Sequence, residues 1–503
     1  MRKPDIFDVR VLLSKWPIRS GINERSFVIY RVFMIGIILL VLIAGGIHIY
    51  LNMPQVPSFS TLEATPGGGM TAKRLSDRTF VSAGANVNRM DELNFWTGFS
   101  LFRDPWIVSP SSTTDRDGLG PLFHTRSCIS CHLGAARGPE PLVGLSKPSA
   151  LVVRLGPLNE TSPMVDPKYG GQLQPRGIKI GHPRLKGPVE GEGKIMLTYV
   201  EVEGAFADGT EYTLRRPNYK LRDLSHGSLA DGIGLSPRLA PVIYGTGLID
   251  AIADEDLLSQ EDPSDVNADG ISARYNRVPN VKTGEINIGR FGFKAKHPNL
   301  AQQVAAAFRD DIGITNDLYP DESCTASQVN CRIAAEIGTA SRVEIPNKLL
   351  KLVLDFNYWL AVPLARNLQG QQQLRGREQF FRAGCAGCHT PSYITDSEYP
   401  DANLAGQTIY PYSDFALHDM GPDLSDGVSE YEAKANEWRT APLWGLGMQQ
   451  EFKRKSTFLH DGRATTVQQA ILWHGGEAEQ SKQYFLNMEK ADRKALITFL
   501  NAI

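Results

Sequence analysis

Two five-residue motifs place cysteine and histidine at the same spacing. Residues 128–132 read CISCH and residues 385–389 read CAGCH, so two residues separate each pair of cysteines and a histidine follows directly. The motifs use four of the six cysteines in a chain of 503 residues. In such a motif the two thiols can add to the vinyl groups of one haem, and the histidine can then ligate the iron. The spacing therefore points first to covalent haem attachment.

Other uses of this spacing fit the sequence less well. A thioredoxin-like CxxC does not require the histidine and usually lies in a βαβ pattern, which is lacking here. A shared four-ligand zinc site would leave surplus histidines and would not explain why the same order occurs twice. We therefore predict two covalently bound c-type haems. The thioether attachments are Cys128, Cys131, Cys385 and Cys388, and the proximal iron ligands are His132 and His389.

The second motif has a candidate partner near the C-terminus. In the segment ATTVQQAILWHGGEA, Thr466 and Gln469 have the spacing of a capping box, and a glycine pair supplies a helix stop. His474 falls at the end of the apolar face of this helix. That position suits an axial ligand of the second haem iron, but it also suits a histidine stabilised by the helix dipole. Met420 and Met448 are the other candidate ligands on this side.

A long apolar segment near the N-terminus predicts a membrane anchor. Residues 32–50 carry no formal charge, and 19 residues is about the length of a helix that crosses a bilayer. Basic residues outnumber acidic ones before it, so the tail, residues 1–31, is expected in the cytoplasm and the bulk of the chain in the periplasm. A cleaved signal peptide is the alternative, although its apolar core is usually shorter. We expect residues 32–51 to anchor the protein in the inner membrane as a single pass, and residues 52–80 to form a linker.

Helical patterning surrounds both motifs, whereas the chain between them is rich in Gly and Pro. Helices are expected at residues 90–106, 348–364, 374–382 and 490–502. Between about residues 140 and 345 helical periodicity is scarce, and two strands are expected to turn at Asp208–Gly209. A paired apolar step precedes each motif, Leu122–Phe123 and Phe380–Phe381, which indicates two related modules.

These patterns predict a mainly α protein. It would contain two cytochrome c-like helical haem modules behind an N-terminal transmembrane helix. The first module, residues 81–365, would carry a large loop-rich insertion with β-strands, and the second would span residues 366–503. A formal net charge of -2 without a basic excess argues against a nucleic-acid partner.

The two remaining cysteines are expected to form a disulfide. Cys324 and Cys331 lie seven positions apart, and thiols tend to pair in an oxidising compartment. Two buried free thiols are the alternative.

One loop has part of a calcium-binding pattern. Asp265, Asn267 and Asp269 stand at positions 1, 3 and 5 of a calcium loop, with Gly270 at position 6. Position 12 is Asn276 rather than glutamate, so the pattern is not a complete EF-hand. We predict a calcium site here, with a plain Asp/Asn-rich turn as the alternative.

Several longer motifs follow Gly118 in order. They are DGLGPLF, SPRLAP (236–241), NADGIS (267–272), GRFGFKA (289–295), LHDMG (417–421), EWRTAPLWGLG (437–447) and FLHDGRATTVQQAILWHGGEA (458–478). On these motifs the chain resembles a bacterial family of di-haem oxidoreductases described as peroxidases and related to dihaem cytochrome c peroxidases. In those peroxidases a segment similar to the last motif carries the axial methionine of the electron-transfer haem. The resemblance therefore implies that His474 is the second axial ligand of the second haem.

The resemblance also implies a function. One haem would reduce hydrogen peroxide or another small oxidant, and the other would relay electrons from a donor cytochrome or cupredoxin. The first haem is the better candidate for the reaction because no partner like His474 follows its motif. Its distal acid/base residues are expected among Gln172, Gln174, Glu190 and Glu192, which lie in glycine-rich stretches downstream. If His182, His226 or His297 closes the sixth position instead, the protein would be a dihaem electron carrier without its own chemistry.

Overall fold

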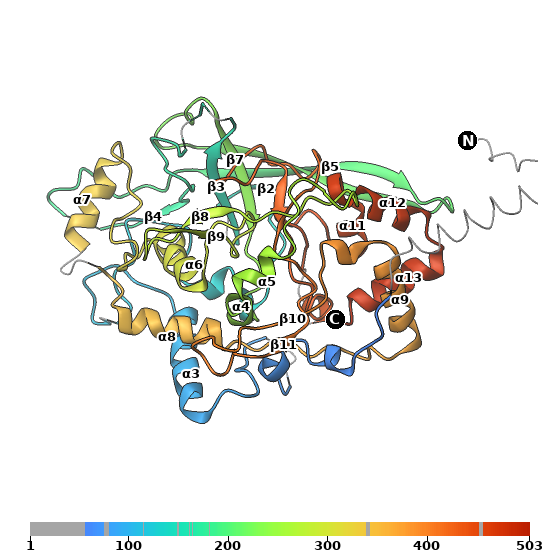
Figure 1. Ribbon diagram of the computed structural model, residues 1–503. Coiled ribbons are helices and arrows are strands. Elements are labelled where there is room, and N and C mark those ends of the chain that lie inside the picture. Colours follow the sequence, from blue (N-terminus) through green and yellow to red (C-terminus); the bar gives the residue numbers. More distant parts are fainter. Residues whose placement is uncertain are drawn as a thin grey trace, which may run out of the picture. The chain divides into compact units, whose positions relative to one another are not determined.

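A computed structural model describes residues 56–74, 80–113, 115–147, 150–159, 161–162, 164–180, 182–338, 343–451 and 456–503 (Figure 1). The predicted anchor and tail, residues 1–51, lie outside these ranges. Among the helices that are described, none has the length and apolar character needed to cross a bilayer. The residues from Val56 to Ile503 belong to one compact unit.

Runs of α-helices and runs of β-strands follow one another along the described chain. The α-helices are α3 (Arg89–Arg103), α4 (Thr246–Asp250), α5 (Asp254–Leu258), α6 (Leu300–Ala307), α7 (Val329–Gly338), α8 (Asn347–Tyr358), α9 (Gln371–Arg382), α10 (Met448–Glu451), α11 (Val467–Leu472), α12 (Glu479–Asn487) and α13 (Lys490–Leu500). The strands are β1 (Leu122–Phe123), β2 (Gly144–Ser146), β3 (Leu151–Pro157), β4 (Arg176–Gly177), β5 (Lys194–Ala205), β6 (Glu211–Arg222), β7 (Ile233–Leu239), β8 (Arg277–Pro279), β9 (Ile286–Ile288), β10 (Tyr393–Ile394), β11 (Thr408–Ile409), β12 (Leu417–Asp419) and β13 (Glu437–Arg439).

The prediction of a mainly α protein is wrong. Helices account for 28% and strands for 19% of the structure. Within the described ranges the strands form five two-stranded sheets and one three-stranded sheet of order β2-β5-β6. The physical reason is that the Gly- and Pro-rich segments cannot satisfy their backbone hydrogen bonds within helices, so short antiparallel pairs satisfy them locally. Even the segment with the second motif contributes two of these pairs, β10-β11 and β12-β13.

Two helix pairs repeat the same packing (Figure 1). Helix α3 packs against α8, and α9 packs against α13. In the first pair, Gly98 of α3 lies against the backbone of Leu352, and four residues later Phe102 meets Phe356 with ring centroids 4.9 Å apart. The helices expected at 90–106 and 348–364 are thus confirmed as α3 and α8, although both end earlier than predicted.

The second pair has the same register. Gly376 of α9 lies against the backbone of Ala495, and four residues later Phe380 meets Phe499 with ring centroids 5.7 Å apart. A glycine is needed at both positions because any Cβ would overlap the facing backbone. The structural counterpart of Phe380 is therefore Phe102. The predicted match to Leu122–Phe123 is wrong, because those residues form strand β1.

The long hairpin β5-β6 crosses from the insertion to the C-terminal helices (Figure 1). Its twelve-residue strands pair from Lys194↔Arg222 to Ala205↔Glu211, and the turn includes the expected Asp208–Gly209. At the tip, Phe206 packs on Phe485 of α12 with ring centroids 5.8 Å apart, and Ala207 N donates to Leu486 O at 3.0 Å. The hairpin therefore fixes the insertion to the part of the chain that includes α11 and His474.

The apolar core also crosses the predicted boundary at residue 365. The largest cluster of buried side chains includes residues of α3, α4, α6 and α8 and of the segments between them, but it also contains Tyr393, Leu404, Phe415 and Trp444. The division into two haem modules stays a prediction.

Candidate haem sites

The two CxxCH motifs have the same backbone conformation. In each motif the first cysteine begins a 3-10 turn, Cys128–Ser130 or Cys385–Gly387, and the second cysteine is the C-cap of that turn. In each, the histidine N donates to the carbonyl of the first cysteine at 2.9 Å. All four cysteines are free thiols, and burial raises the pKa of Cys128 and of Cys385 to about 12. One turn of chain thus presents two neutral thiols and one imidazole at each motif.

Three histidines share one hydrogen-bond arrangement. Nδ1 of His132 donates to Pro241 O at 2.8 Å, and Nδ1 of His389 donates to Tyr412 O at 2.8 Å. Nδ1 of His474 donates to Ala470 O at 2.7 Å. A carbonyl can only accept, so each pairing places the proton on Nδ1 and leaves the lone pair on Nε2. This is the tautomer that an iron-ligating histidine needs.

The environment of these imidazoles also suits metal ligation. Burial lowers the pKa of His132 and of His389 to about 4, and it lowers the pKa of His474 as well. Each ring is therefore neutral at physiological pH, as a ligand must be. All three side chains lie deep in the protein and yet remain partly accessible to water. Histidines that lie deep in the protein and are still partly accessible to water fit side chains that face a space within the fold.

Aromatic rings from the two helix pairs contact the proximal histidines. The Phe102 ring lies 6.4 Å from the His132 ring, and the Phe380 ring lies 6.5 Å from the His389 ring, between centroids. Each phenylalanine is the one that packs next to the helix-crossing glycine. The helix crossing thus positions the histidine of its own motif.

The two sites differ in their second histidine. His474 lies close enough to His389 for its charge to lower the pKa of His389. For His132, the pKa responds to burial and to the bond with Pro241, and no histidine of the described chain exerts a comparable influence. Helix α11 is shorter than predicted and ends at Leu472, so His474 lies just beyond it. The Thr466 side chain accepts from Gln469 N at 3.1 Å and caps that helix as expected.

A family comparison fits this pair of sites. A family model described as "di-haem oxidoreductase, putative peroxidase" matches residues 62–503. The chain belongs to this family. Searches of curated proteins and of solved structures gave no match. A di-haem protein of this family needs two iron sites, and the two CxxCH turns with their neutral histidines supply suitable residues.

Three further histidines were candidates for the first haem of this di-haem oxidoreductase. His182 Nδ1 accepts from Arg184 N at 3.2 Å on the surface of the insertion. His226 packs edge-on against Tyr169 with ring centroids 5.8 Å apart. His297 is buried, and burial followed by the charge of Arg154 lowers its pKa to about 4. None of them makes a described hydrogen bond or ring contact with residues of the CISCH turn.

Of the predicted distal residues, Gln172 bonds to a carboxyl group that influences the first motif. Its Nε2 donates to Asp311 Oδ1 at 2.9 Å, and its Oε1 accepts from Arg154 Nη1 at 2.8 Å. The Asp311 carboxyl is close enough to raise the pKa of both Cys128 and Cys131. Burial raises the pKa of Asp311 itself to about 6. Asp311 was not predicted, because it is nearly 180 residues from the motif and no local pattern marks it.

The other three predicted distal residues lie apart from Asp311's carboxyl. Gln174 N donates to a carboxylate oxygen of Glu192, and Gln328 Nε2 donates to the other oxygen. Burial raises the pKa of Glu192 to about 8. Glu190 is exposed at the surface. Gln174 is linked to the site only through its Nε2, which donates to the Asp310 carbonyl.

One buried histidine, His418, supports the second motif through its contacts with two carboxylates. His418 Nε2 bonds Asp414 Oδ2 and its Nδ1 bonds Glu477 Oε2, both at 2.7 Å, and Nδ1 lies 3.6 Å from Cys388 Sγ. Burial alone would lower the pKa of His418, but Cys388 and Asp414 raise it well above its ordinary value. Both ring nitrogens are engaged, so His418 positions this turn and is not available as an iron ligand.

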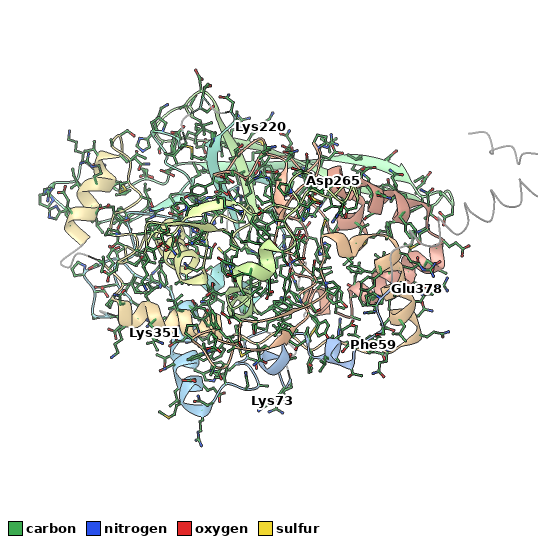
Figure 2. All side chains as sticks on the ribbon, in the orientation of Figure 1. Phe59, Lys73, Lys220, Asp265, Lys351 and Glu378 are labelled. Carbon is green, nitrogen blue, oxygen red and sulfur yellow. A yellow bond between two sulfur atoms is a disulfide. The ribbon has the colours of Figure 1, made fainter. Side chains whose placement is uncertain are left out.

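The predicted calcium loop lies next to the same turn. Asp265, labelled in Figure 2, accepts from Gly270 N at 3.1 Å, and Asn267 Oδ1 accepts from Asp269 N at 2.9 Å. Ile271 at the end of the loop packs against Gly387 of the CAGCH turn. No group of three His, Cys, Asp or Glu side chains suited to a metal occurs in the described chain. Calcium binding stays a prediction.

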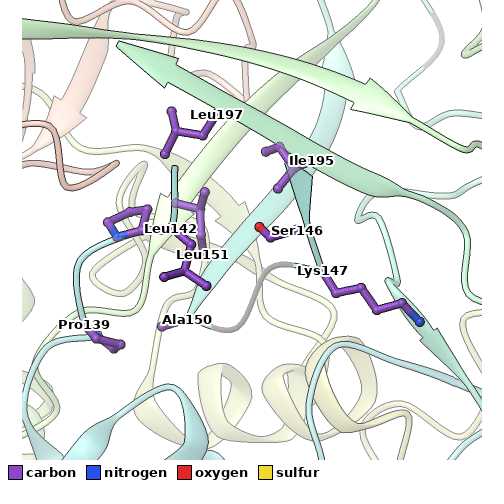
Figure 3. Close-up of a pocket in the computed structure, with 9 residues that line it drawn as sticks. Pro139, Leu142, Ser146, Lys147, Ala150, Leu151, Ile195 and Leu197 are labelled. Carbon is purple, nitrogen blue, oxygen red and sulfur yellow. The ribbon is translucent and has the colours of Figure 1, made fainter. Parts of the chain in front are cut away.

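Two other features lie outside the haem sites. Cys324 and Cys331 form a disulfide with a Cα–Cα distance of 5.7 Å. Figure 3 shows a recess between residues 139–151 and strand β5, lined by apolar side chains including Leu142, Leu151 and Ile195. Its lining contains no histidine, cysteine or carboxylate, so the recess offers no group for redox or acid/base chemistry.

Proposed function

We propose that this di-haem oxidoreductase reduces hydrogen peroxide at the first motif, with electrons relayed through the second. The haems would be attached covalently through the two cysteine pairs, with His132 and His389 as proximal ligands. One observation carries the proposal. His389 has a second neutral histidine close by, His474, whereas no described histidine influences His132 in the same way.

A haem held by Cys128, Cys131 and His132 would supply the redox centre for reducing one hydrogen peroxide, with two electrons and two protons, to two water molecules. The chain must supply and position the protons. Asp311 has a pKa of about 6, so near neutral pH a fraction of its carboxyl is protonated and can donate. Gln172 holds Asp311 Oδ1 through its amide at 2.9 Å and so fixes the direction of the carboxyl. Of the four predicted distal residues, we retain Gln172 in this positioning role.

The second site is suited to electron transfer. His389 and His474 would both hold the haem iron at this site, which would leave no place there for a small oxidant. Such a pair also lacks the potential-raising effect of a methionine ligand. Two contacts support this role for His474: its Nδ1 donates to Ala470 O, and Gln469 of the neighbouring helix α11 donates to Thr213 O of the hairpin β5-β6 at 3.0 Å.

The proposed setting is the periplasm. Residues 32–51 would anchor the protein in the inner membrane, and a cytochrome or cupredoxin would donate electrons. The Cys324–Cys331 disulfide is consistent with an oxidising compartment, where c-type haem is also attached. Protease treatment of spheroplasts tests this: residues 56–503 are expected to be digested from outside, and full protection would contradict the location.

Spectroscopy of the ferric protein tests the function. We expect one high-spin and one low-spin haem, and the high-spin signal is expected to change when peroxide is added. His474→Ala is expected to convert the low-spin haem to high spin, whereas the matched control His182→Ala is expected to leave both signals unchanged. Two low-spin haems that do not respond to peroxide would refute the proposal and would indicate a dihaem electron carrier.

Covalent attachment is tested separately. The unaltered protein is expected to keep two haems per chain after denaturation, as detected by haem staining. Replacing both cysteines of one motif with alanine is expected to reduce this number to one. Loss of all haem on denaturation of the unaltered protein would contradict a c-type linkage.

A further inference from the structure

Two arginines lie deep in the fold without a carboxylate partner of their own. Arg137 Nη2 donates to Leu459 O, and its buried Nε has no hydrogen-bond partner. Arg439 donates through Nε to Gly292 O at 2.9 Å and through Nη1 to Thr440 O at 3.2 Å. Burial lowers the pKa of both arginines to about 10. Both side chains therefore carry a positive charge that the described chain balances only from a distance.

Other deeply placed arginines are paired directly. The ion pairs are Arg154 with Asp310, Arg238 with Glu430, Arg377 with Glu63 and Arg463 with Asp461. The nearest carboxylates to the two unusual arginines already have partners. Asp461, which acts on Arg137, is paired with Arg463, and Asp414, which acts on Arg439, is paired with His418. Both arginines are only partly accessible to water, and a cation that has lost much of its water is costly without an anion beside it, so an anion from outside the chain would stabilise both positions.

Arg137 is fixed beside the first haem motif. It follows His132 by five residues in the chain. The next residue, Gly138, donates from N to Ala240 O at 2.9 Å, directly before Pro241. Pro241 is the residue whose carbonyl accepts the Nδ1 proton of His132. Arg137 is thus connected to His132 along the chain, and through Gly138 to the segment whose Pro241 carbonyl orients His132.

Arg439 has the equivalent position beside the second motif. It pairs with Leu417 across β12 and β13, and Thr440 N donates to Ala416 O at 2.9 Å. Ser413 Oγ donates to Thr440 O at 2.8 Å, directly after Tyr412. Tyr412 is the residue whose carbonyl accepts the Nδ1 proton of His389.

The two arginines meet at one segment of the GRFGFKA motif. The Arg137 guanidinium carbon lies 5.9 Å from the centre of the Phe293 ring. Arg439 N donates to Phe293 O at 2.8 Å, and its Nε donates to the preceding residue, Gly292. Phe293 therefore contacts both arginines, each of which lies beside a different haem motif.

We propose that Arg137 binds a propionate of the haem on His132 and that Arg439 binds a propionate of the haem on His389, with Phe293 between the two sites. The inference rests on the proposed function, because it requires both haems to be held at the two motifs. A haem carries two propionates, and a guanidinium can bind a carboxylate through two parallel hydrogen bonds. The arginine charge at each site would then be neutralised by a propionate of the haem beside the same loop.

Reduction potentials test the assignment. A positive charge beside a propionate favours the reduced haem, which carries one positive charge fewer on iron. Arg137→Gln is expected to lower the reduction equilibrium constant of the first haem about tenfold, which corresponds to about 59 mV for one electron. Arg439→Gln is expected to do the same for the second haem only. Arg382→Gln is the matched control, because it removes the same charge from an exposed site on α9 and is expected to leave both potentials unchanged.

Several outcomes would overturn the inference. Each variant is first assayed for covalently bound haem, and loss of haem from the unaltered protein would contradict the proposed function instead. With both haems present, unchanged potentials, or equal shifts of both haems in each variant, would refute the assignment. Should Arg137→Gln fail to fold, Arg137→Lys retains the charge but not the forked geometry. In the resonance Raman spectrum of Arg137→Lys, the bending band of the propionate on the first haem is expected to shift. An unshifted band would refute the contact between Arg137 and that propionate.

Discussion

The two helix-crossing glycines provide a matched pair of perturbations. An alanine Cβ at Gly98 would lie 1.9 Å from Leu352 O, and one at Gly376 would lie 2.0 Å from Ala495 O. Real Cβ atoms essentially never approach a heavy atom more closely than 3.0 Å, so each substitution must move a helix by at least about 1 Å. The obstacle is backbone in both cases, which cannot rotate away as a flexible side chain would.

The expected destabilisation follows from two opposing effects. Overpacking of a core costs typically about 1–3 kcal/mol, and a clash with rigid backbone belongs at the upper end. Alanine is favoured over glycine within a helix by about 1 kcal/mol. The net loss in the free energy of unfolding is therefore expected to be about 2 kcal/mol for Gly98→Ala and for Gly376→Ala alike.

The same variants should separate the two haems spectroscopically. A shift of α9 moves Phe380, which lies 6.5 Å from the His389 ring, and a shift of α3 moves Phe102, which lies 6.4 Å from the His132 ring. Gly376→Ala is therefore expected to change the spectrum of the low-spin haem, and Gly98→Ala that of the high-spin haem.

The assay combines guanidinium unfolding, followed by far-UV circular dichroism, with visible and electron paramagnetic resonance spectra. Gln372→Ala on the exposed side of α9 is the control, since it is expected to leave stability and both spectra unchanged. Variants as stable as this control would refute the packing argument. A change at the wrong haem would refute the assignment of one helix pair to each site.

Further substitutions test other parts of the structure. His474→Met is expected to raise the reduction potential of the second haem, as measured by spectroelectrochemistry, because methionine ligation favours ferrous iron; an unchanged potential would exclude His474 as a ligand. Asp311→Asn is expected to lower peroxide turnover at least tenfold and to remove a transition near pH 6 from the rate profile, and a profile that keeps this transition would assign it to another group. Burial raises the pKa of Glu192 from 4.5 to about 8, so the folded state binds its proton more tightly than the unfolded state and stability should fall as pH rises between these values. Glu192→Gln should flatten this dependence in unfolding experiments at a series of pH values, and an unchanged slope would contradict the assignment. Phe206→Ala at the hairpin tip should destabilise the protein by about 3 kcal/mol, since a buried aromatic side chain is removed, and a loss below about 1 kcal/mol in the same assay would show that the tip contact contributes little.

Local features could be predicted from the sequence with success. The helices beside the motifs, and the hairpin turning at Asp208–Gly209, depend on periodicity and on turn residues a few positions apart. The cap of the helix before His474 depends on Thr466 and Gln469, three residues apart. Each of these signals lies within one element, so tertiary contacts did not need to be known.

The remaining features depend on contacts between distant parts of the chain. The carbonyl that orients His132 comes from Pro241, 109 residues away, and local periodicity does not mark it. The strand content was missed because two-residue strands such as β1 and β4 exist only as pairs, and neither carries an alternating pattern of its own. The relation between Gly98 and Gly376 could have been found by aligning the helices on glycine and the phenylalanine four residues later, rather than on the apolar pairs nearest the cysteines.

The contact between Arg137 and Leu459 has a consequence for how the protein matures. The two residues are 322 positions apart, and the hydrogen bond from Leu239 N to His460 O at 2.7 Å joins strand β7 to the same C-terminal segment. A ribosome makes the first cysteine motif long before it makes residue 459, so the surroundings of that motif stay incomplete during most of synthesis. The thiols of Cys128 and Cys131 would therefore remain accessible to the haem-attachment machinery until the last part of the chain arrives. Late closure by the C-terminal segment would give the first haem time to be attached before its site is buried.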